Sequence, residues 1–252
     1  MATRGIVSFA ATLAFAVSTA GAGSAAPAAH AATVCLDSSS PSFGVEQKIV
    51  AALARYGDAL TPFVYDGSQG VSERFFKYLS RTKCALIMGF PVDRENPDPP
   101  DGLALTEPYF ETAYVLVSPR KLEQRDLHAG MTVAVGMATA PHFYLAGAFG
   151  AAPGVTTDTY QTQEQVLDAL SEGHAAAAMV WEPSLVRYAG SHPGARNWHV
   201  TALHIPHARW GVAALYVESR PAEAQRFNAA LLGFERSGGL SSLTHVYSTG
   251  SQ

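Results

Sequence analysis

Apolar and polar positions alternate in the first third of the chain in a pattern typical of strands and helices that follow one another. Val45, Ile49 and Leu53 recur at the spacing of an amphipathic helix, and short apolar runs bounded by polar residues have the length of strands. The pattern predicts the order strand, helix, strand, helix, strand, over residues 33–36, 45–56, 61–65, 71–80 and 85–88. This order predicts a parallel sheet with right-handed crossover connections.

The apolar run over 85–88 leads into the stretch that directs the search for a site. We expect the strand to break at Gly89, Phe90 and Pro91, and a long polar loop to follow before a second apolar run over 113–117. In an open α/β sheet, the chain that leaves the carboxyl end of a strand faces the ligand crevice. The loop that opens at Gly89 is therefore the first candidate for a binding site.

The alternation of strands and helices continues in the rest of the chain. Thr162 and Gln165 form the pattern of a capping box, which predicts the start of a helix that ends at Gly173. The same reasoning predicts strands over 132–135, 175–181 and 210–217, another strand that ends at Tyr160, and helices from about 141, over 221–232 and over 241–247.

The first residues have the features of an export signal. Arg4 is a short basic region, Ile6 to Val17 is apolar, and Ala29-His30-Ala31 matches a cleavage site with small residues. We expect cleavage near Ala31, so that removal of residues 1–31 from the 252-residue chain leaves 221. The apolar run is shorter than the about 20 residues of a membrane span, and no membrane anchor is expected after cleavage.

Charge and motifs exclude several classes of function. The formal charge is −4, and it becomes −5 without Arg4. Since the chain contains no basic run, nucleic acid and anionic membranes are not expected partners. The sequence contains no nucleophile elbow, phosphate-binding loop or dinucleotide fingerprint, so we predict a protein that is not an enzyme and needs no cofactor. His204 and His207 lack an acidic third ligand nearby, and no metal site is predicted.

Cys35 and Cys84 are the two cysteines of the chain, 49 positions apart. Two cysteines in an exported protein favour a disulfide, because the compartment is oxidising. A single pair does not form a zinc site without histidines at ligand spacing. We therefore predict a structural Cys35–Cys84 disulfide.

The stretch CALIMGFPVDRENPDPPDGLALTEPYFETAYVLVSPR, from Cys84 to Arg120, resembles a known family. Its segment Leu105–Tyr109 matches the T/S-x-P-Y pattern in the first lobe of type II periplasmic solute-binding proteins, similar to bacterial extracellular solute-binding family 3. The form CALIMGFPVD…LTEPYFETAYVLV is more similar still to the branch associated with quinoprotein (PQQ) methanol dehydrogenases. AGMTVAVGMATAPHFYL and AAAAMVWEPSLVRYA resemble segments of the second lobe, although Glu182 stands where the branch has Gly.

The resemblance implies an α/β, two-lobe periplasmic binding protein fold of type II, with two crossovers between the lobes. We expect the first lobe to comprise residues 33–117 and 211–252, and the second lobe to comprise 118–210. The last strand of the first sheet would then return from the second lobe.

The loops after the predicted strands would bring together a set of candidate ligand-binding residues: Asp37, Ser39, Tyr65, Asp66, Phe90, Arg94, Thr139, Trp181 and Glu182. Core packing is the alternative role for Tyr65 and Phe90. By the family's pattern Arg94 would grip a ligand carboxylate, and the alternative is a surface ion pair with Asp93 or Glu95.

The resemblance to the dehydrogenase-associated branch implies a periplasmic protein that assists the maturation or activation of a quinoprotein alcohol dehydrogenase, its partner. The alternative is the substrate-binding subunit of an ABC importer, with an ABC permease as partner and an amino acid or small organic acid as ligand. Because prolines interrupt the Arg94 loop and the acidic partner is displaced, we expect no tight binding of free α-amino acids.

Overall fold

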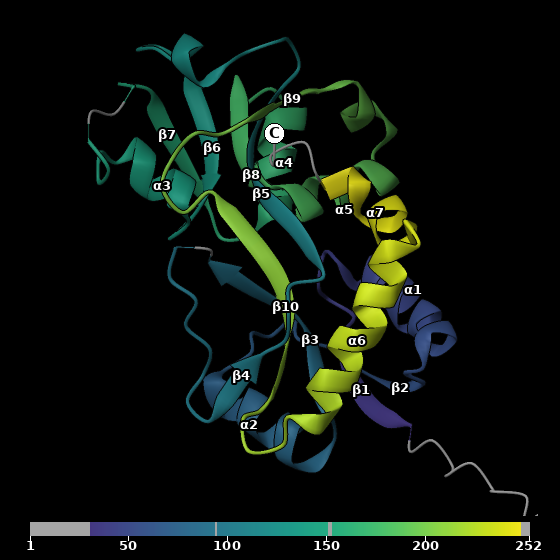
Figure 1. Cartoon of the computed structure of the whole chain (residues 1–252). Helices are drawn as coiled ribbons and strands as arrows, with labels where there is room; N and C mark the ends of the chain where they lie inside the picture. Colours follow the sequence, from purple (N-terminus) through teal and green to yellow (C-terminus); the bar gives the residue numbers. More distant parts are fainter. Residues whose placement is uncertain (1–30, 94, 151–152, 248–252) are drawn as a thin grey trace, which may run out of the picture.

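The computed structural model describes residues 31–93, 95–150 and 153–247, and these form two lobes joined by a pair of strands (Figure 1). Residues 1–30 of the predicted signal segment 1–31, and Arg94, lie outside the described residues. No helix in the described part of the chain is both long and apolar enough to cross a membrane.

The first lobe contains a parallel arrangement of three strands with β1 in the centre. Its first elements are β1 (Ala32–Asp37), α1 (Phe43–Leu53), β2 (Leu60–Tyr65), α2 (Glu73–Thr82) and β3 (Leu86–Asp93). These elements follow the predicted order. Most of their ends lie within a few residues of the predicted ends.

The expected break at Gly89 is wrong, because β3 continues through it to Asp93. Gly89 has a φ of 85°, which a glycine adopts without the steric cost of a side chain. The register of the neighbouring strand shifts opposite this position, so the chain passes a bulge instead of ending the strand.

Strand β10 (Arg209–Val217) completes the sheet of the first lobe, although it follows the second lobe in the chain. It is antiparallel to β3 on one side and to β4 (Leu103–Leu105) on the side of β5. Helices α6 (Ala222–Arg236) and α7 (Gly239–Thr244) follow and pack against α1. Phe227 of α6 is fully buried with Ile49 and Leu53 in the main apolar cluster of this lobe.

The second lobe forms around β6 and β8, which are parallel, with β7 parallel to β6 at the edge. Its elements are β6 (Thr132–Gly136), α3 (Ala140–Leu145), β7 (Thr156–Tyr160), α4 (Gln163–Ser171), β8 (Ala177–Trp181), α5 (Glu182–Ser191) and β9 (His199–Ala202). The predicted capping box is confirmed, since the Thr162 side chain accepts from the Gln165 N–H and the Gln165 side chain accepts from the Thr162 N–H.

Short 3-10 turns connect several of these elements, at Ala54–Tyr56, Gln124–Asp126, Pro193–Asn197 and His245–Tyr247.

Strand β5 (Phe110–Ser118) belongs to both lobes. Residues 110–113 pair antiparallel with β10, and residues 114–118 pair with β8 and β9. In Figure 1, β5 and β10 run side by side through the centre of the molecule, between the two lobes. The two chain connections between the lobes are therefore neighbouring strands of one ladder.

The predicted disulfide is confirmed. Cys35 of β1 is bonded to Cys84, which directly precedes the β3 region, and both residues are buried in an apolar cluster with Leu79, Ile87 and Leu215. The bond ties the first and third strands of the chain together across a separation of 49 residues.

We expect the double variant C35A/C84A to lose about 4 kcal/mol of unfolding free energy, because the bond removes the closure entropy of a 49-residue loop from the unfolded state. Guanidinium unfolding of the oxidised protein and of the variant measures the difference. Reductant should lower the stability of the wild type and leave the variant unchanged, whereas equal stability of all samples would contradict a structural role.

Candidate functional site

A cavity of about 320 Å³ lies between the two lobes, within the range of about 300–1,000 Å³ that is usual for ligand pockets. Both lobes contribute to its lining, which consists of Ser40, Pro41, Ser42, Gly89, Pro91, Tyr114, Gln163, Trp181, Pro183, Ser184, Trp210 and Val212. We call this cavity the cleft.

Three aromatic rings form an apolar wall of the cleft. Trp181, at the end of β8, is 5.2 Å from Tyr114 of β5 and 6.1 Å from Trp210 of β10, measured between ring centroids. Tyr114 and Trp181 lie opposite each other in the β5–β8 ladder, which explains their contact. Burial raises the pKa of Tyr114 to about 12, so its hydroxyl keeps its proton at neutral pH.

The indole N–H of Trp210 donates to the His207 carbonyl at 2.8 Å, so this ring is fixed by the segment that leads into β10. The wall therefore combines one residue from β8 with one from each of the two connecting strands. Its residues meet because β5 pairs with β10 on one side and with β8 on the other.

On the first-lobe side, a chain of hydroxyl groups runs from the cleft to a buried carboxyl. Ser40 and Ser42 line the cleft, and their Oγ atoms are 2.9 Å apart. The Ser42 hydroxyl donates to Glu46 Oε1 at 2.6 Å, and the hydroxyl of Tyr109 donates to the same oxygen at 3.1 Å. The Gly89 N–H in turn donates to the Tyr109 hydroxyl at 2.6 Å.

Glu46 lies directly behind the cleft wall. Its side chain is fully buried, and a methyl group added at Gly89 would meet the carboxyl oxygens at 3.2 and 3.4 Å. Desolvation raises the pKa of Glu46 to about 7, against the hydrogen bonds from Ser42 and Tyr109, which lower it. Gly89 is thus required both for its positive φ and for the space beside the carboxyl.

The described lining of the cleft consists of aromatic, aliphatic and uncharged polar residues. Among the described residues that line it, none has an ionisable acidic or basic side chain. Nor does the described part of the chain contain a group of three or more His, Cys, Asp or Glu residues that could hold a metal ion.

Trp181 is the residue of the predicted site set that lines this cleft. Asp37 and Ser39 lie close by in the loop after β1, where Asp37 Oδ1 accepts from the Ser39 N–H, the Ser39 hydroxyl and the Gly67 N–H. The Ser39 carbonyl accepts from Arg187 of α5 at 2.6 Å, which makes a contact between the lobes.

Other predicted residues lie elsewhere. Tyr65 packs against Phe75, and Phe90 packs against Phe76, both in the cluster that contains the disulfide. Asp66 is exposed, and hydrogen bonds from Ser68 lower its pKa.

Thr139 caps α3, since its Oγ1 accepts from the His142 N–H and donates to the Gly136 carbonyl. Glu182 is buried as the first residue of α5, next to the cleft-lining Pro183. Arg94 lies outside the described residues.

Sequence reasoning missed most of the lining, including Ser42, Tyr114, Gln163 and Trp210. Ser42 carried a weak signal, because a serine before a helical pattern is a common N-cap. Tyr114 and Trp210 sit in apolar runs, and only their pairing partners bring them to the cleft.

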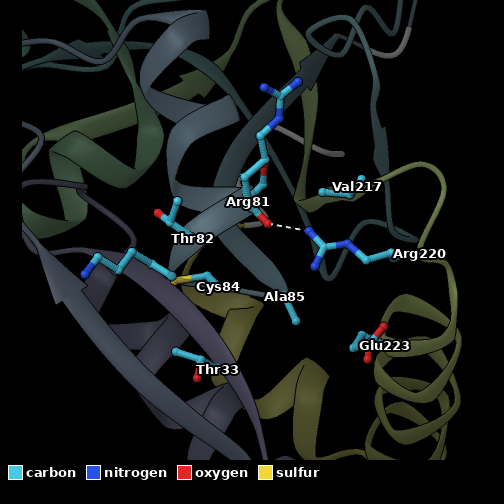
Figure 2. Close-up of a pocket in the computed structure, with 10 residues that line it drawn as sticks. Thr33, Arg81, Thr82, Cys84, Ala85, Val217, Arg220 and Glu223 are labelled. Atoms are coloured by element: carbon cyan, nitrogen blue, oxygen red, sulfur yellow. Dashed lines mark hydrogen bonds between the residues drawn. The ribbon is translucent and has the colours of Figure 1, made fainter.

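A second hollow, of about 230 Å³, lies at the opposite end of the first-lobe sheet (Figure 2). Arg220 donates to the Ser80 carbonyl at 2.6 Å there, and Arg81 points away from Arg220 and Thr33. The basic groups do not converge on one point, so we place the candidate site in the cleft.

Comparison with known proteins gives matches to solved structures. No protein-family model matches the sequence, and neither does a curated protein. Substrate-binding domain 2 of GlnP from Lactococcus lactis, in an open conformation, is 19% identical with a TM-score of 0.65, covering 86% of this chain and 94% of that one. An ancestral cationic amino acid solute-binding protein is 14% identical with a TM-score of 0.66, covering 86% and 95%.

The second substrate-binding domain of a putative amino acid ABC transporter from Streptococcus pneumoniae is 18% identical with a TM-score of 0.63, covering 85% of this chain and 98% of that one. At sequence identities this low, the matches show the fold alone. The chain has the two-lobe α/β fold of periplasmic binding proteins, as the sequence predicted.

From the raised pKa of Glu46 we predict how the free energy of unfolding changes with pH. The pKa of Glu46 is about 7 in the folded protein and 4.5 in its ordinary state. The protonated Glu46 therefore contributes fully to the stability of the fold below pH 4.5, and this contribution is lost as the pH rises through 7. The loss is roughly 3 kcal/mol. We expect Glu46→Gln to flatten this part of the pH profile, measured by chemical unfolding from pH 4 to 8. Exposed Glu164→Gln is the control and should retain the wild-type slope; an unchanged slope in Glu46→Gln would contradict the assignment.

Proposed function

We propose that the protein is a solute-binding protein that holds one small molecule in the cleft between its lobes and delivers it to an ABC importer. The observation that carries the proposal is the cleft itself, because its lining comes from both lobes and joins an aromatic wall to a few polar groups. Solved structures of the same fold include substrate-binding domains of amino acid ABC transporters, which supports this kind of function.

The proposal includes the division of the chain and its location. The first lobe would comprise 33–117 and 211–252 and the second 118–210, with β5 and β10 as the hinge on which the lobes close around the ligand. The export signal with cleavage near Ala31 would place the protein in the periplasm. The protein acts by binding, and we propose no catalytic role for it.

The second candidate is assistance to a quinoprotein alcohol dehydrogenase. The sequence resemblance favours it, and so does the proline-rich segment 95–102, which contains no helix or strand. The segment begins beside the cleft, since Glu95 accepts from the N–H of His207, whose carbonyl holds the Trp210 ring. Prolines would reduce the entropy that this segment loses when it docks on a partner.

We expect Trp181→Leu to weaken binding of the cognate solute about tenfold or more, because the ring forms the centre of the aromatic wall. Thermal-shift screening of a solute library followed by calorimetry measures the affinity. Trp198→Leu is the control, since Trp198 packs on Tyr188 in the second lobe. Free α-amino acids should not bind at micromolar concentration, and a micromolar amino acid would show that the expected ligand class is wrong.

Deletion of residues 97–100 tests the second candidate. If the segment docks a dehydrogenase, the deletion lowers quinoprotein dehydrogenase activity in periplasmic extracts, while the purified protein keeps its melting temperature. Unchanged dehydrogenase activity, together with co-purification of a permease alone, would exclude the dehydrogenase role and favour the importer.

A further inference from the structure

The walls of the cleft carry information about the chemical class of its ligand. This inference rests on the proposed function, because it assumes that a small molecule occupies the cleft. The aromatic rings of Tyr114, Trp181 and Trp210 contact one another in series at 5.2 and 6.1 Å. Trp181 is tilted by 57° to Tyr114 and perpendicular, at 89°, to Trp210, so the rings form an apolar corner in which a flat ring can stack on one of them and meet the others by their edges.

The described lining offers no charged partner to a charged ligand. An ammonium or carboxylate group that enters such a site loses its hydration without an ion pair in return, which is costly. The described lining therefore favours an uncharged molecule.

Two helices begin at the cleft, and each already has a carboxyl group at its start. Ser42, which precedes α1, and Pro183 and Ser184 of α5 belong to the lining. A helix N-terminus favours negative charge, but Glu46 in the first turn of α1 and Glu182 at the first position of α5 are both buried there. Each of the two N-termini therefore already has a buried carboxyl group within its first turn.

The hydroxyl chain has a fixed direction. A serine hydroxyl can donate one hydrogen bond, and Ser42 donates its hydrogen bond to Glu46 Oε1. The 2.9 Å contact between Ser40 and Ser42 is then a hydrogen bond that Ser40 donates. Tyr109 also donates to Oε1, so this is the direction of the chain when Glu46 is ionised.

Both serines therefore use their protons inside the wall and retain acceptor capacity. Ser42 Oγ donates once and accepts once from Ser40, while Ser40 Oγ donates once and accepts from the Ser42 N–H at 3.3 Å. Each oxygen has one lone pair that these bonds do not use, and both residues line the cleft. A ligand group that meets these oxygens must be a hydrogen-bond donor.

We propose that the cleft binds an uncharged aromatic molecule that carries an O–H or N–H group. The ring lies against Tyr114, Trp181 and Trp210, and the donor group is accepted by Ser40 and Ser42, whose orientation is set by Glu46. Phenols and indoles are the simplest compounds of this class.

Isothermal titration calorimetry of the full chain tests the class with matched probes. Indole and 4-methylphenol have the ring and the donor, N-methylindole and 4-methylanisole have the ring without the donor, and L-tryptophan and L-tyrosine add the charged groups. We expect the two donors to bind, and both the methylated and the zwitterionic counterparts to bind at least about tenfold more weakly, because a buried acceptor or an unpaired charge is then left without a partner.

The variant Ser42→Ala should abolish the difference between indole and N-methylindole. Ser38→Ala, in the same loop but outside the cleft lining, is the matched control and should keep the difference. Each comparison is a ratio of two affinities within one protein, so a change in stability does not imitate the result.

The outcomes separate this inference from the proposed function. Equal binding of the donor and methylated probes, or the same ratio in Ser42→Ala and wild type, would overturn the ligand class. Tight binding of a charged or non-aromatic solute that Trp181→Leu weakens would overturn the ligand class and support solute binding. A complete lack of binding across all probes and a broad solute library would overturn both.

Discussion

The antiparallel pairing of β5 with β10 is the interaction on which the arrangement of the molecule depends. It brings together two segments about one hundred residues apart, Arg209–Val212 and Phe110–Ala113, in one ladder. Because β10 also pairs with β3 and β5 also pairs with β8, this ladder connects the sheets of both lobes. The register places Tyr114 opposite Trp181, and Trp210 reaches the same wall from the other strand. A shift of one residue would turn these side chains to the opposite face.

The first lobe contributes the polar side of the cleft through an unusual core residue. Most fully buried positions in this lobe are apolar, whereas Glu46 places a carboxyl group between α1, β3 and the Tyr109 segment. Such a group is costly to desolvate, and its pKa shows this cost. In return it holds two hydroxyl groups in fixed orientations, and through Tyr109 it fixes the backbone of Gly89. The burial of the Glu46 carboxyl thus costs free energy, and the same carboxyl orders the hydroxyl groups behind the cleft.

The sequence predicted the succession of strands and helices well, because amphipathic spacing in α1 and the capping box at Thr162 are local signals. The disulfide was predictable for another reason, because the chain has a single pair of cysteines. The site was predicted less completely. Trp181 is the last residue of an apolar strand and could be found. Tyr114 and Trp210 look like core residues of their strands, and the register with a distant strand decides where they point. Gly89 looked like a strand end, because a bulge within a ladder has no local sequence pattern that distinguishes it from a turn.

The position of β10 has a consequence for the order of folding. The elements from β6 to β9 follow one another in the chain and pair with one another and with β5, so their contacts can form as soon as this segment is available. The first sheet contains β1, β2 and β3 from the beginning of the chain but needs Arg209–Val217 to cover the edge of β3. Contacts over such a separation form slowly, because a long loop must close first. The segment synthesised earliest is therefore completed last, and until then β3, which pairs with β1 on its other side, has an open edge.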